Sequence, residues 1–366
     1  MGKIRLDRKS ISSLGGRKEN SYRSLRKTKN ETVNADFSKT DEINNFIKTN
    51  NEKGELNFQE CIGQGSESYV YKAELIKSNK NVAAKIRFIQ EEGNPNFNEV
   101  IISKKLKHQN IIDIYGCYKL KENEFDCILM EYASYGNLRD FQFKVLKRNC
   151  LSETLLCFIA FQILNGLKYL ESCKIANLDL KPQNIVINEY LNVKLIDFSI
   201  SIDYSKIKIE LPLKGTNFYM APEVLSSKVI ETKDLGKVDL FSLGIILYNL
   251  AFAIYPFGLN HDDSKNYKRI LYKIMNNDLE IEDNSFSPHF IDLLKKLLEK
   301  DINKRININQ ALNHYWVKGA KILYDEKEKL YNAGSFLSLL ITDQIKEFND
   351  YIFKIPEKII FFPFFN

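Results

Sequence analysis

Residues 177–184 read Asn-Leu-Asp-Leu-Lys-Pro-Gln-Asn, and this stretch decides how the rest of the chain is interpreted. It places a carboxylate, Asp179, close to a cation, Lys181, and an amide, Asn184. A strand-like run then ends in an Asp-Phe pair at Asp197, one short hairpin later. Carboxylate and amide oxygens are the hard ligands that Mg²⁺ prefers. The plainer interpretation of Asp197 is an aspartate that only ends a strand.

The residues around this stretch fall into a strand-rich part and a helix-rich part. Five apolar runs bounded by Gly and Asn turns predict strands, and one run with apolar residues at helical spacing predicts a helix. The strands are expected at 56–62, 69–75, 82–88, 111–118 and 127–132, and the helix at 97–106. After Gly136 the pattern turns helical, with expected helices at 152–170, 245–253 and 290–298. The sequence therefore predicts a small β-rich lobe followed by a larger α-rich one.

Further motifs flank this stretch in a fixed order. Upstream, residues 62–70 read Ile-Gly-Gln-Gly-Ser-Glu-Ser-Tyr-Val, and residues 82–85 read Val-Ala-Ala-Lys. Downstream, residues 215–223 read Gly-Thr-Asn-Phe-Tyr-Met-Ala-Pro-Glu, and residues 239–244 read Asp-Leu-Phe-Ser-Leu-Gly. Each motif alone is common, whereas the ordered series is not.

The series resembles the eukaryotic-type protein kinase superfamily over residues 56–317, with 177–184 similar to the catalytic loop H-R-D-L-K-P-x-N. The lysine at position 181 resembles the serine/threonine class more than the tyrosine class. The resemblance implies an α+β, bilobal protein kinase fold. Its N-lobe (56–133) would hold a five-stranded antiparallel sheet and one helix, and its C-lobe (134–317) would be helical. It also implies a transferase that moves the γ-phosphoryl group of ATP to serine or threonine hydroxyls of a protein substrate, with ATP and Mg²⁺ as cofactors.

The same resemblance assigns roles to individual residues. Phosphoryl transfer needs mainly positioning and electrostatic stabilisation, so one base, one lysine and metal-holding oxygens suffice. The catalytic residues would be Asp179, Lys181, Lys85 and its partner Glu99, and the metal ligands would be Asn184 and Asp197. The nucleotide would lie against Ile62, Gly63, Gly65, Val70, Ala83, Lys85, Glu131, Ala133 and Val186, with Met130 as gatekeeper. Arg305 resembles the arginine that pairs with the glutamate of the Ala-Pro-Glu motif, here Glu223.

Four positions depart from the family pattern. Leu178 replaces the arginine before the catalytic aspartate, which makes the loop a non-RD type and reduces the expected effect of loop phosphorylation. Asn177 replaces a histidine, and Ser103 stands where the helix usually offers leucine. In the family both positions stack with Phe198, so these polar side chains need hydrogen-bond partners if they are buried. Ser199 replaces a glycine and reduces backbone freedom.

These departures leave two classes of function open. An active serine/threonine kinase is favoured because Lys85, Glu99, Asp179, Asn184 and Asp197 are all retained. The alternative is a pseudokinase that acts as a nucleotide-binding scaffold or allosteric partner. Turnover that depends on Asp179 would separate the two.

The net charge of +6 is concentrated at one end of the chain. Residues 1–30 hold ten Lys and Arg against Asp7 and Glu19, a net of +8. Residues 1–50 are therefore expected to form a basic, disordered tail. Such a tail could bind an anionic surface, nucleic acid or an acidic partner, although nucleic acid is expected least. A solvated extension is the plainer interpretation.

The remaining features bear on location and on the end of the chain. The six cysteines form no C-x-x-C pair and are expected to be reduced thiols, which favours a cytoplasmic or nuclear protein. No stretch reaches the ~20 apolar residues of a bilayer span, so no transmembrane segment is expected. Residues 318–366 form a C-terminal extension whose apolar end is expected to pack on the kinase body.

Overall fold

The computed structural model describes residues 56–65, 68–88, 97–120, 125–205, 216–227, 230–281, 286–321 and 324. The expected basic tail, nearly all of the C-terminal extension, and Ser66 and Glu67 of the glycine motif lie outside these residues.

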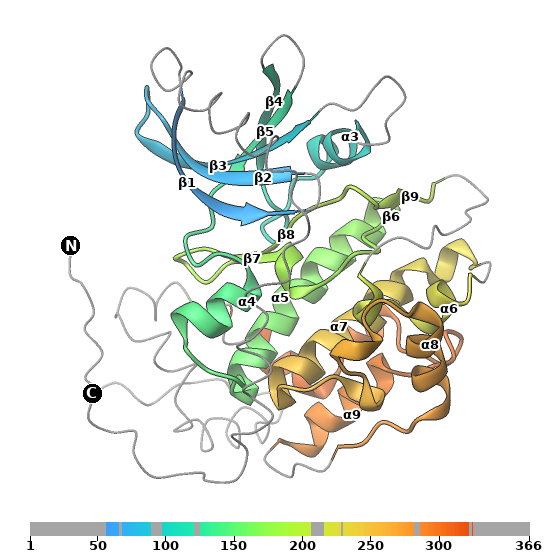
Figure 1. The fold of residues 1–366 in the computed structure, drawn as a ribbon. Coiled ribbons are helices and arrows are strands. Elements are labelled where there is room, and N and C mark those ends of the chain that lie inside the picture. The colour runs from blue at the N-terminus through green and yellow to red at the C-terminus, as the bar shows by residue number, and fades with distance from the viewer. Residues whose placement is uncertain are drawn as a thin grey trace, which may run out of the picture. The chain divides into compact units, whose positions relative to one another are not determined.

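A five-stranded antiparallel sheet opens the described chain, as expected. Its order is β1-β2-β3-β5-β4 (Figure 1). The strands are β1 (Leu56–Gln64), β2 (Ser68–Leu75), β3 (Lys80–Phe88), β4 (Ile114–Leu120) and β5 (Phe125–Glu131), and α3 (Phe97–Lys105) contacts β4. Every residue of β3 from Val82 to Arg87 is buried, which is the burial of a central strand covered on both faces.

The fourth strand begins at Ile114 rather than at Ile111, where the apolar run starts. The backbone of residues 111–112 pairs elsewhere. Ile111 forms a parallel bridge with Leu195, and the Ile112 amide donates to the Leu195 carbonyl at 3.0 Å. The first residues of the apolar run therefore pair with Leu195, and the later ones pair with β5. Hydrophobicity alone does not distinguish these two partners.

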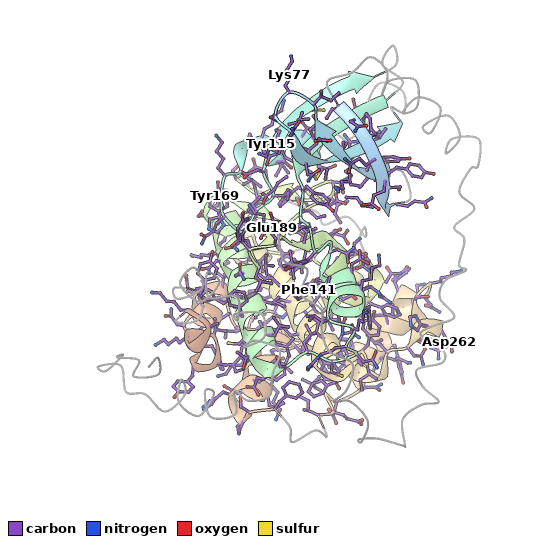
Figure 2. The ribbon with its side chains drawn as sticks, turned by 90° about the vertical axis from the view of Figure 1, so that its left-hand side faces the viewer. Lys77, Tyr115, Phe141, Tyr169, Glu189 and Asp262 are labelled. Carbon is purple, nitrogen blue, oxygen red and sulfur yellow. The ribbon has the colours of Figure 1, made fainter. Side chains whose placement is uncertain are left out.

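Three helices pack together at the centre of the helical part: α5 (Glu153–Ser172), α7 (Leu235–Phe252) and α9 (Pro288–Leu297). α5 and α9 lie where the sequence predicts them, whereas α7 begins ten residues before the expected segment 245–253. α7 contacts both of the others, and Phe141 (labelled in Figure 2) is fully buried in the same core. The other helices are α4 (Leu138–Asp140), the π-helical turn η2 (Phe141–Val145), α6 (Pro222–Leu225), α8 (Tyr267–Asn276) and α10 (Ile308–Leu312).

Short strands and 3₁₀ turns connect these helices and carry the motif residues. The strands pair as β6 with β9 and as β7 with β8, both antiparallel. The strands are β6 (Ile175–Ala176), β7 (Ile185–Ile187), β8 (Val193–Leu195) and β9 (Ile202–Asp203), and the 3₁₀ turns are η3 (Pro182–Asn184), η4 (Asn217–Tyr219), η5 (Thr232–Asp234), η6 (Pro256–Gly258) and η7 (His261–Asp263).

One helix qualifies as a membrane span by length and composition. In the described residues, the segment Thr232–Phe252 has a mean hydropathy of 1.4 in its most apolar window, and 78% of that window is buried inside the fold. The statement that no stretch has the apolar length of a span was therefore too strong. Its burial and its contacts with α5 and α9 are those of a core helix.

Candidate active site

A buried lysine and glutamate join β3 to α3. Lys85 Nζ lies 2.8 Å from Glu99 Oε1 and 3.0 Å from Glu99 Oε2. The same ammonium lies 3.4 Å from Asp197 Oδ1, on the segment after β8. The structure therefore brings together three of the residues that the sequence motifs singled out.

Charge pairing at this point outweighs the cost of burial. Burial alone lowers the pKa of Lys85, but Glu99 and Asp197 together raise it above its usual value. Burial likewise works against the charge of Asp197, yet Lys85 and Ser199 bring its pKa below the usual value. At neutral pH both groups are ionised, as a phosphate-binding lysine and a metal-binding carboxylate must be.

Asp179 is held by a cluster of side chains from three segments. Lys181 Nζ donates to Asp179 Oδ2 at 2.6 Å and to Thr216 Oγ1 at 2.9 Å. Thr216 in turn donates to Asp179 Oδ1 from both its amide and its hydroxyl, each at 3.1 Å. Asn184 Nδ2 donates to the Asp179 carbonyl at 2.9 Å and to Oδ2 at 3.0 Å. A carboxylate fixed in this way cannot rotate freely, which suits a group that must orient an incoming hydroxyl.

The backbone before Asp179 is fixed by Asp239, in the first half of α7. The amides of Asn177 and Leu178 donate to Asp239 Oδ2 and Oδ1, each at 2.8 Å. Leu178 has a φ of 66°, a conformation that side chains other than glycine rarely adopt, and its side chain packs against the core. Burial raises the pKa of Asp239 to about 6, although the two amides oppose this rise.

Asn184 and Asp197 provide oxygens that fit a magnesium ion. They are neighbours through the β7–β8 hairpin, because the Ile196 amide donates to the Asn184 carbonyl at 2.9 Å. Asn184 uses its amide nitrogen on Asp179, so its Oδ1 is the atom left for a metal. Asp197 has a φ of 62°, and its Oδ1 accepts the Ser199 amide at 3.3 Å. A serine in place of the family's glycine at position 199 is thus compatible with this conformation of Asp197. An amide oxygen and a carboxylate form the hard donor set that Mg²⁺ takes.

An apolar cluster lies beside these polar residues. Ala83 and Met130, which are register partners on β3 and β5, are buried in it, and Val70 and Val186 pack against it. Ile62 on β1 is 38% exposed, and Gly63 is the register partner of Val70. An apolar surface with a few polar groups at its edge is the usual lining of a nucleotide pocket.

The glycine motif and the segment after β5 complete the predicted nucleotide site. A Cβ at Gly63 would lie 3.6 Å from Val70 Cβ, an ordinary contact, so the free protein does not itself demand glycine there. Gly65 is the last described residue before Ser66. Glu131 Oε2 lies 2.7 Å from Lys194 Nζ on β8, and the Ala133 carbonyl accepts the Gly136 amide at 3.0 Å. Side chain and turn thus fix the segment whose backbone is predicted to bind adenine.

Phe198 and the two polar replacements, Ser103 and Asn177, are all buried. Ser103 is 4% exposed and Asn177 is 1% exposed. Asn177 Oδ1 accepts the Asp179 amide at 3.2 Å, whereas its Nδ2 has no hydrogen-bond partner among the described residues. Of the two polar atoms of the Asn177 side-chain amide, the oxygen therefore has the hydrogen-bond partner that burial requires.

Three residues that matter here were given no role from the sequence. Thr216 and Asp239 were quoted only as letters of motifs, and their contacts with residues 177–181 join segments far apart in the chain. Arg87 was overlooked, although it follows Lys85 by two positions and so faces the same side of β3. A charge on the buried face of an apolar strand was the available signal.

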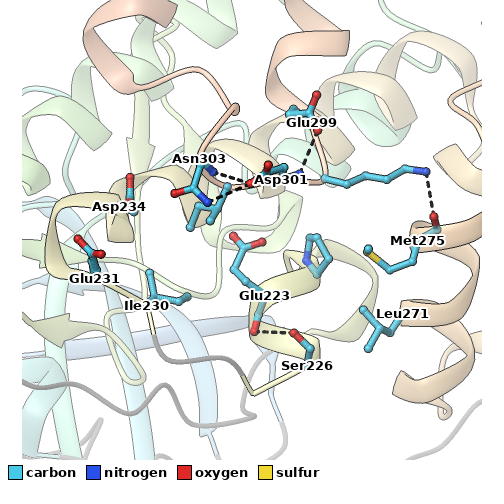
Figure 3. Close-up of a pocket in the computed structure, with 13 residues that line it drawn as sticks. Glu223, Ser226, Ile230, Glu231, Asp234, Leu271, Met275, Glu299, Asp301 and Asn303 are labelled. Carbon is cyan, nitrogen blue, oxygen red and sulfur yellow. Dashed lines mark hydrogen bonds between the residues drawn. The ribbon is translucent and has the colours of Figure 1, made fainter.

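A cavity of about 720 Å³ lies elsewhere in the helical part, between α6, α8 and residues 299–303 (Figure 3). Glu223 lines it, and the carboxylate of Glu223 is paired with Arg305, whose Nη1 and Nη2 lie 2.6 and 2.9 Å from its two oxygens. This pairing was expected from the sequence. The cavity contains none of the predicted nucleotide or metal residues.

Comparison with known proteins gives the family. The protein kinase domain matches residues 56–317. Among curated proteins, the chain is 31% identical over 298 residues to the probable serine/threonine-protein kinase fhkA of Dictyostelium discoideum, covering 72% of this chain and 50% of that protein. It is 32% identical over 274 residues to the serine/threonine-protein kinase pakH of the same organism, covering 73% and 51%. It is 34% identical over 267 residues to the serine/threonine-protein kinase TIO of Arabidopsis thaliana, covering 71% and 19%.

The chain spans about half the length, or less, of these relatives. The family match over residues 56–317 nevertheless covers most of this chain. The sheet, the helices and the Lys85–Glu99 pair of the structure agree with that family. The chain belongs to the eukaryotic-type protein kinase superfamily.

Proposed function

We propose that this protein transfers the γ-phosphoryl group of ATP to serine or threonine hydroxyls of other proteins, in the cytoplasm or nucleus. The observation that carries the proposal is the assembled state of the site. Lys85 is paired with Glu99 and lies 3.4 Å from Asp197, while Asp179 is held by Lys181, Thr216 and Asn184. A site that had lost its activity would not need all of these contacts.

Each residue has a separate task in the proposed reaction. Asp179 orients the substrate hydroxyl and accepts its proton. The two hydrogen bonds that Asp179 accepts from Thr216 fix the orientation of the carboxylate. Lys181 lies between Asp179 and Thr216 and supplies positive charge where negative charge develops. Lys85 binds the phosphates of the nucleotide. Asn184 and Asp197 would hold Mg²⁺, which would supply positive charge for the phosphates of the nucleotide.

The choice of serine and threonine rests on Lys181 and on the relatives. All three relatives named above carry serine/threonine kinase names. The alternative of a pseudokinase scaffold has no support among them, and the charged residues that such proteins often lack are present here. The buried Asn177 amide remains the feature least suited to a rigid active site.

The test is phosphoryl transfer from radiolabelled ATP by the full chain, with and without Mg²⁺, compared with Asp179→Asn. We expect wild-type labelling of itself or of a mixed protein substrate, and a loss of about a thousandfold or more in the variant, because the base is removed. Phosphoamino-acid analysis should show phosphoserine and phosphothreonine. Wild-type and variant signals that are equal, with ATP binding intact, would establish the scaffold instead.

A further inference from the structure

Arg87 is a buried cation that the proposed reaction does not use directly. It lies two residues after Lys85 on β3, so both side chains project from the same face of the strand. The residue is only 6% exposed. Because a guanidinium stays protonated, its burial requires negative partners.

Two carboxylates from different elements receive this guanidinium. Arg87 Nη1 lies 3.2 Å from Glu99 Oε2 on α3, and Arg87 Nη2 lies 3.6 Å from Asp126 Oδ2 on β5. Asp126 is also the register partner of Arg87 across the β3–β5 ladder. Arg87 thus joins the first turn of α3 to the two central strands of the sheet.

Glu99 therefore has two cations rather than one. Its Oε2 lies 3.0 Å from Lys85 Nζ and 3.2 Å from Arg87 Nη1. Lys85 is also shared with Asp197, and in the proposed reaction it must be shared with phosphate as well. Arg87 has no such second duty in the reaction, so its hold on Glu99 does not depend on the nucleotide.

We propose that Arg87 is a positioning residue that fixes Glu99, and with it the start of α3, independently of Lys85. Lys85 then finds its partner already in place when ATP arrives. The kinetic part of this inference rests on the proposed function. The structural part does not, because it concerns the position of α3 in the free protein.

Hydrogen exchange of the α3 amides in the full chain tests the structural part. In Lys85→Met, exchange across α3 should stay close to wild type, because Arg87 still holds Glu99. In Lys85→Met/Arg87→Met it should rise by about tenfold or more relative to the β3 and β5 amides, since local opening no longer breaks an ion pair. Lys80→Met, which removes an exposed charge from the same strand, is the matched control and should change nothing.

Kinetics with ATP test the functional part. Arg87→Met should lower kcat/KM for ATP by about tenfold to a hundredfold, because a misplacement of about 1 Å can cost that much. Arg87→Lys should recover part of the loss, since one ammonium can reach Glu99 or Asp126 but cannot fork to both. Lys80→Met should keep wild-type kinetics.

The outcomes separate the two proposals. Exchange at α3 that is the same in Lys85→Met and in Lys85→Met/Arg87→Met overturns the inference, as does a fall in melting temperature of Arg87→Met with unchanged kcat/KM. If Lys85→Met/Arg87→Met does not fold, Arg87→Lys and Asp126→Asn in the Lys85→Met background carry the test, and wild-type exchange in both counts against it. If the wild type transfers no phosphate while the exchange results hold, the proposed function fails and the role of Arg87 stands.

Discussion

Asp239 is a fully buried carboxylate whose two oxygens each accept one backbone amide, from Asn177 and from Leu178. Burial raises its pKa from 3.8 to about 6, so the folded protein binds this proton more tightly than the unfolded chain does. The stability that comes from this proton is complete below pH 4 and is lost as the pH rises through 6.

The change of stability with pH can be measured against a variant that does not titrate. Between pH 4 and pH 6.5 the stability of the wild type, relative to Asp239→Asn, should fall by about 2 kcal/mol and then level off. Urea unfolding of both proteins at several pH values measures this difference. A difference that is flat over the whole range would place the folded pKa of Asp239 near its ordinary value.

Single residues were the most predictable part of the site. Lys85, Asp179, Asn184 and Asp197 stand in short motifs, so their identity could be read from a few neighbouring letters. Of their contacts, the Lys85–Glu99 pair was expected from the family resemblance, whereas those of Asp179 with Thr216 were not. Arg87 and Glu99 lie 12 positions apart and meet only because the fold places the first turn of α3 beside β3.

At the scale of elements, the crossing of α7 and α9 depends on one glycine. A Cβ added at Gly244 would lie 2.8 Å from Leu298 Cδ2 and 3.0 Å from Leu297 Cβ. Such distances force the two helices apart or push Leu298 out of its rotamer. Gly236 lies in the same helix, and a Cβ there would meet only Glu171 Oε1 at 3.5 Å.

Two alanine substitutions in α7 should therefore have opposite effects. Gly244→Ala should lower the free energy of unfolding by about 1–2 kcal/mol, since overpacking exceeds the gain of roughly 1 kcal/mol in helix propensity. Gly236→Ala should leave stability unchanged or raise it by up to about 1 kcal/mol. Chemical denaturation of both variants decides the matter, and equal effects would mean that the helix crossing tolerates a methyl group.

Elements were predicted well where they were long and apolar, and poorly where a run had two partners. α5 and α9 lie where helical spacing predicts them, whereas the apolar run at 245–253 predicted only the second half of α7. The start of β4 was misplaced because Ile111 pairs with Leu195 across the chain, a choice that depends on the folded arrangement.

At the scale of the whole molecule, the buried pair of Glu223 and Arg305 ties the start of α6 to the segment before α10. Arg305 Nη1 also donates to the Lys237 carbonyl at 3.0 Å, and the arginine is 2% exposed. Removal of one partner from such a pair leaves an uncompensated buried charge.

Loss of this pair should weaken the whole fold rather than the chemistry. Arg305→Met should lower the free energy of unfolding by about 3–5 kcal/mol, because Glu223 is left buried without its cation. The double variant Arg305→Met/Glu223→Gln should recover part of that loss. Thermal unfolding of the three proteins tests this, and a single variant as stable as wild type would show that Glu223 reaches solvent or another donor.

The architecture of the molecule was predictable because the order of motifs limits it to one arrangement of sheet and helices. The cavity beside Glu223 was not, since its walls come from α6, α8 and residues 299–303, which share no sequence pattern.

The ionised state of Lys85 has a consequence for covalent chemistry. Acylating and sulfonylating reagents attack the neutral amine, and the pKa of Lys85 is raised by Glu99 and Asp197 despite its burial. At neutral pH the neutral amine is therefore rare. Reagents that label lysines by intrinsic reactivity will therefore modify the exposed ones first, and an inhibitor meant to bond to Lys85 must gain its rate from being held beside it.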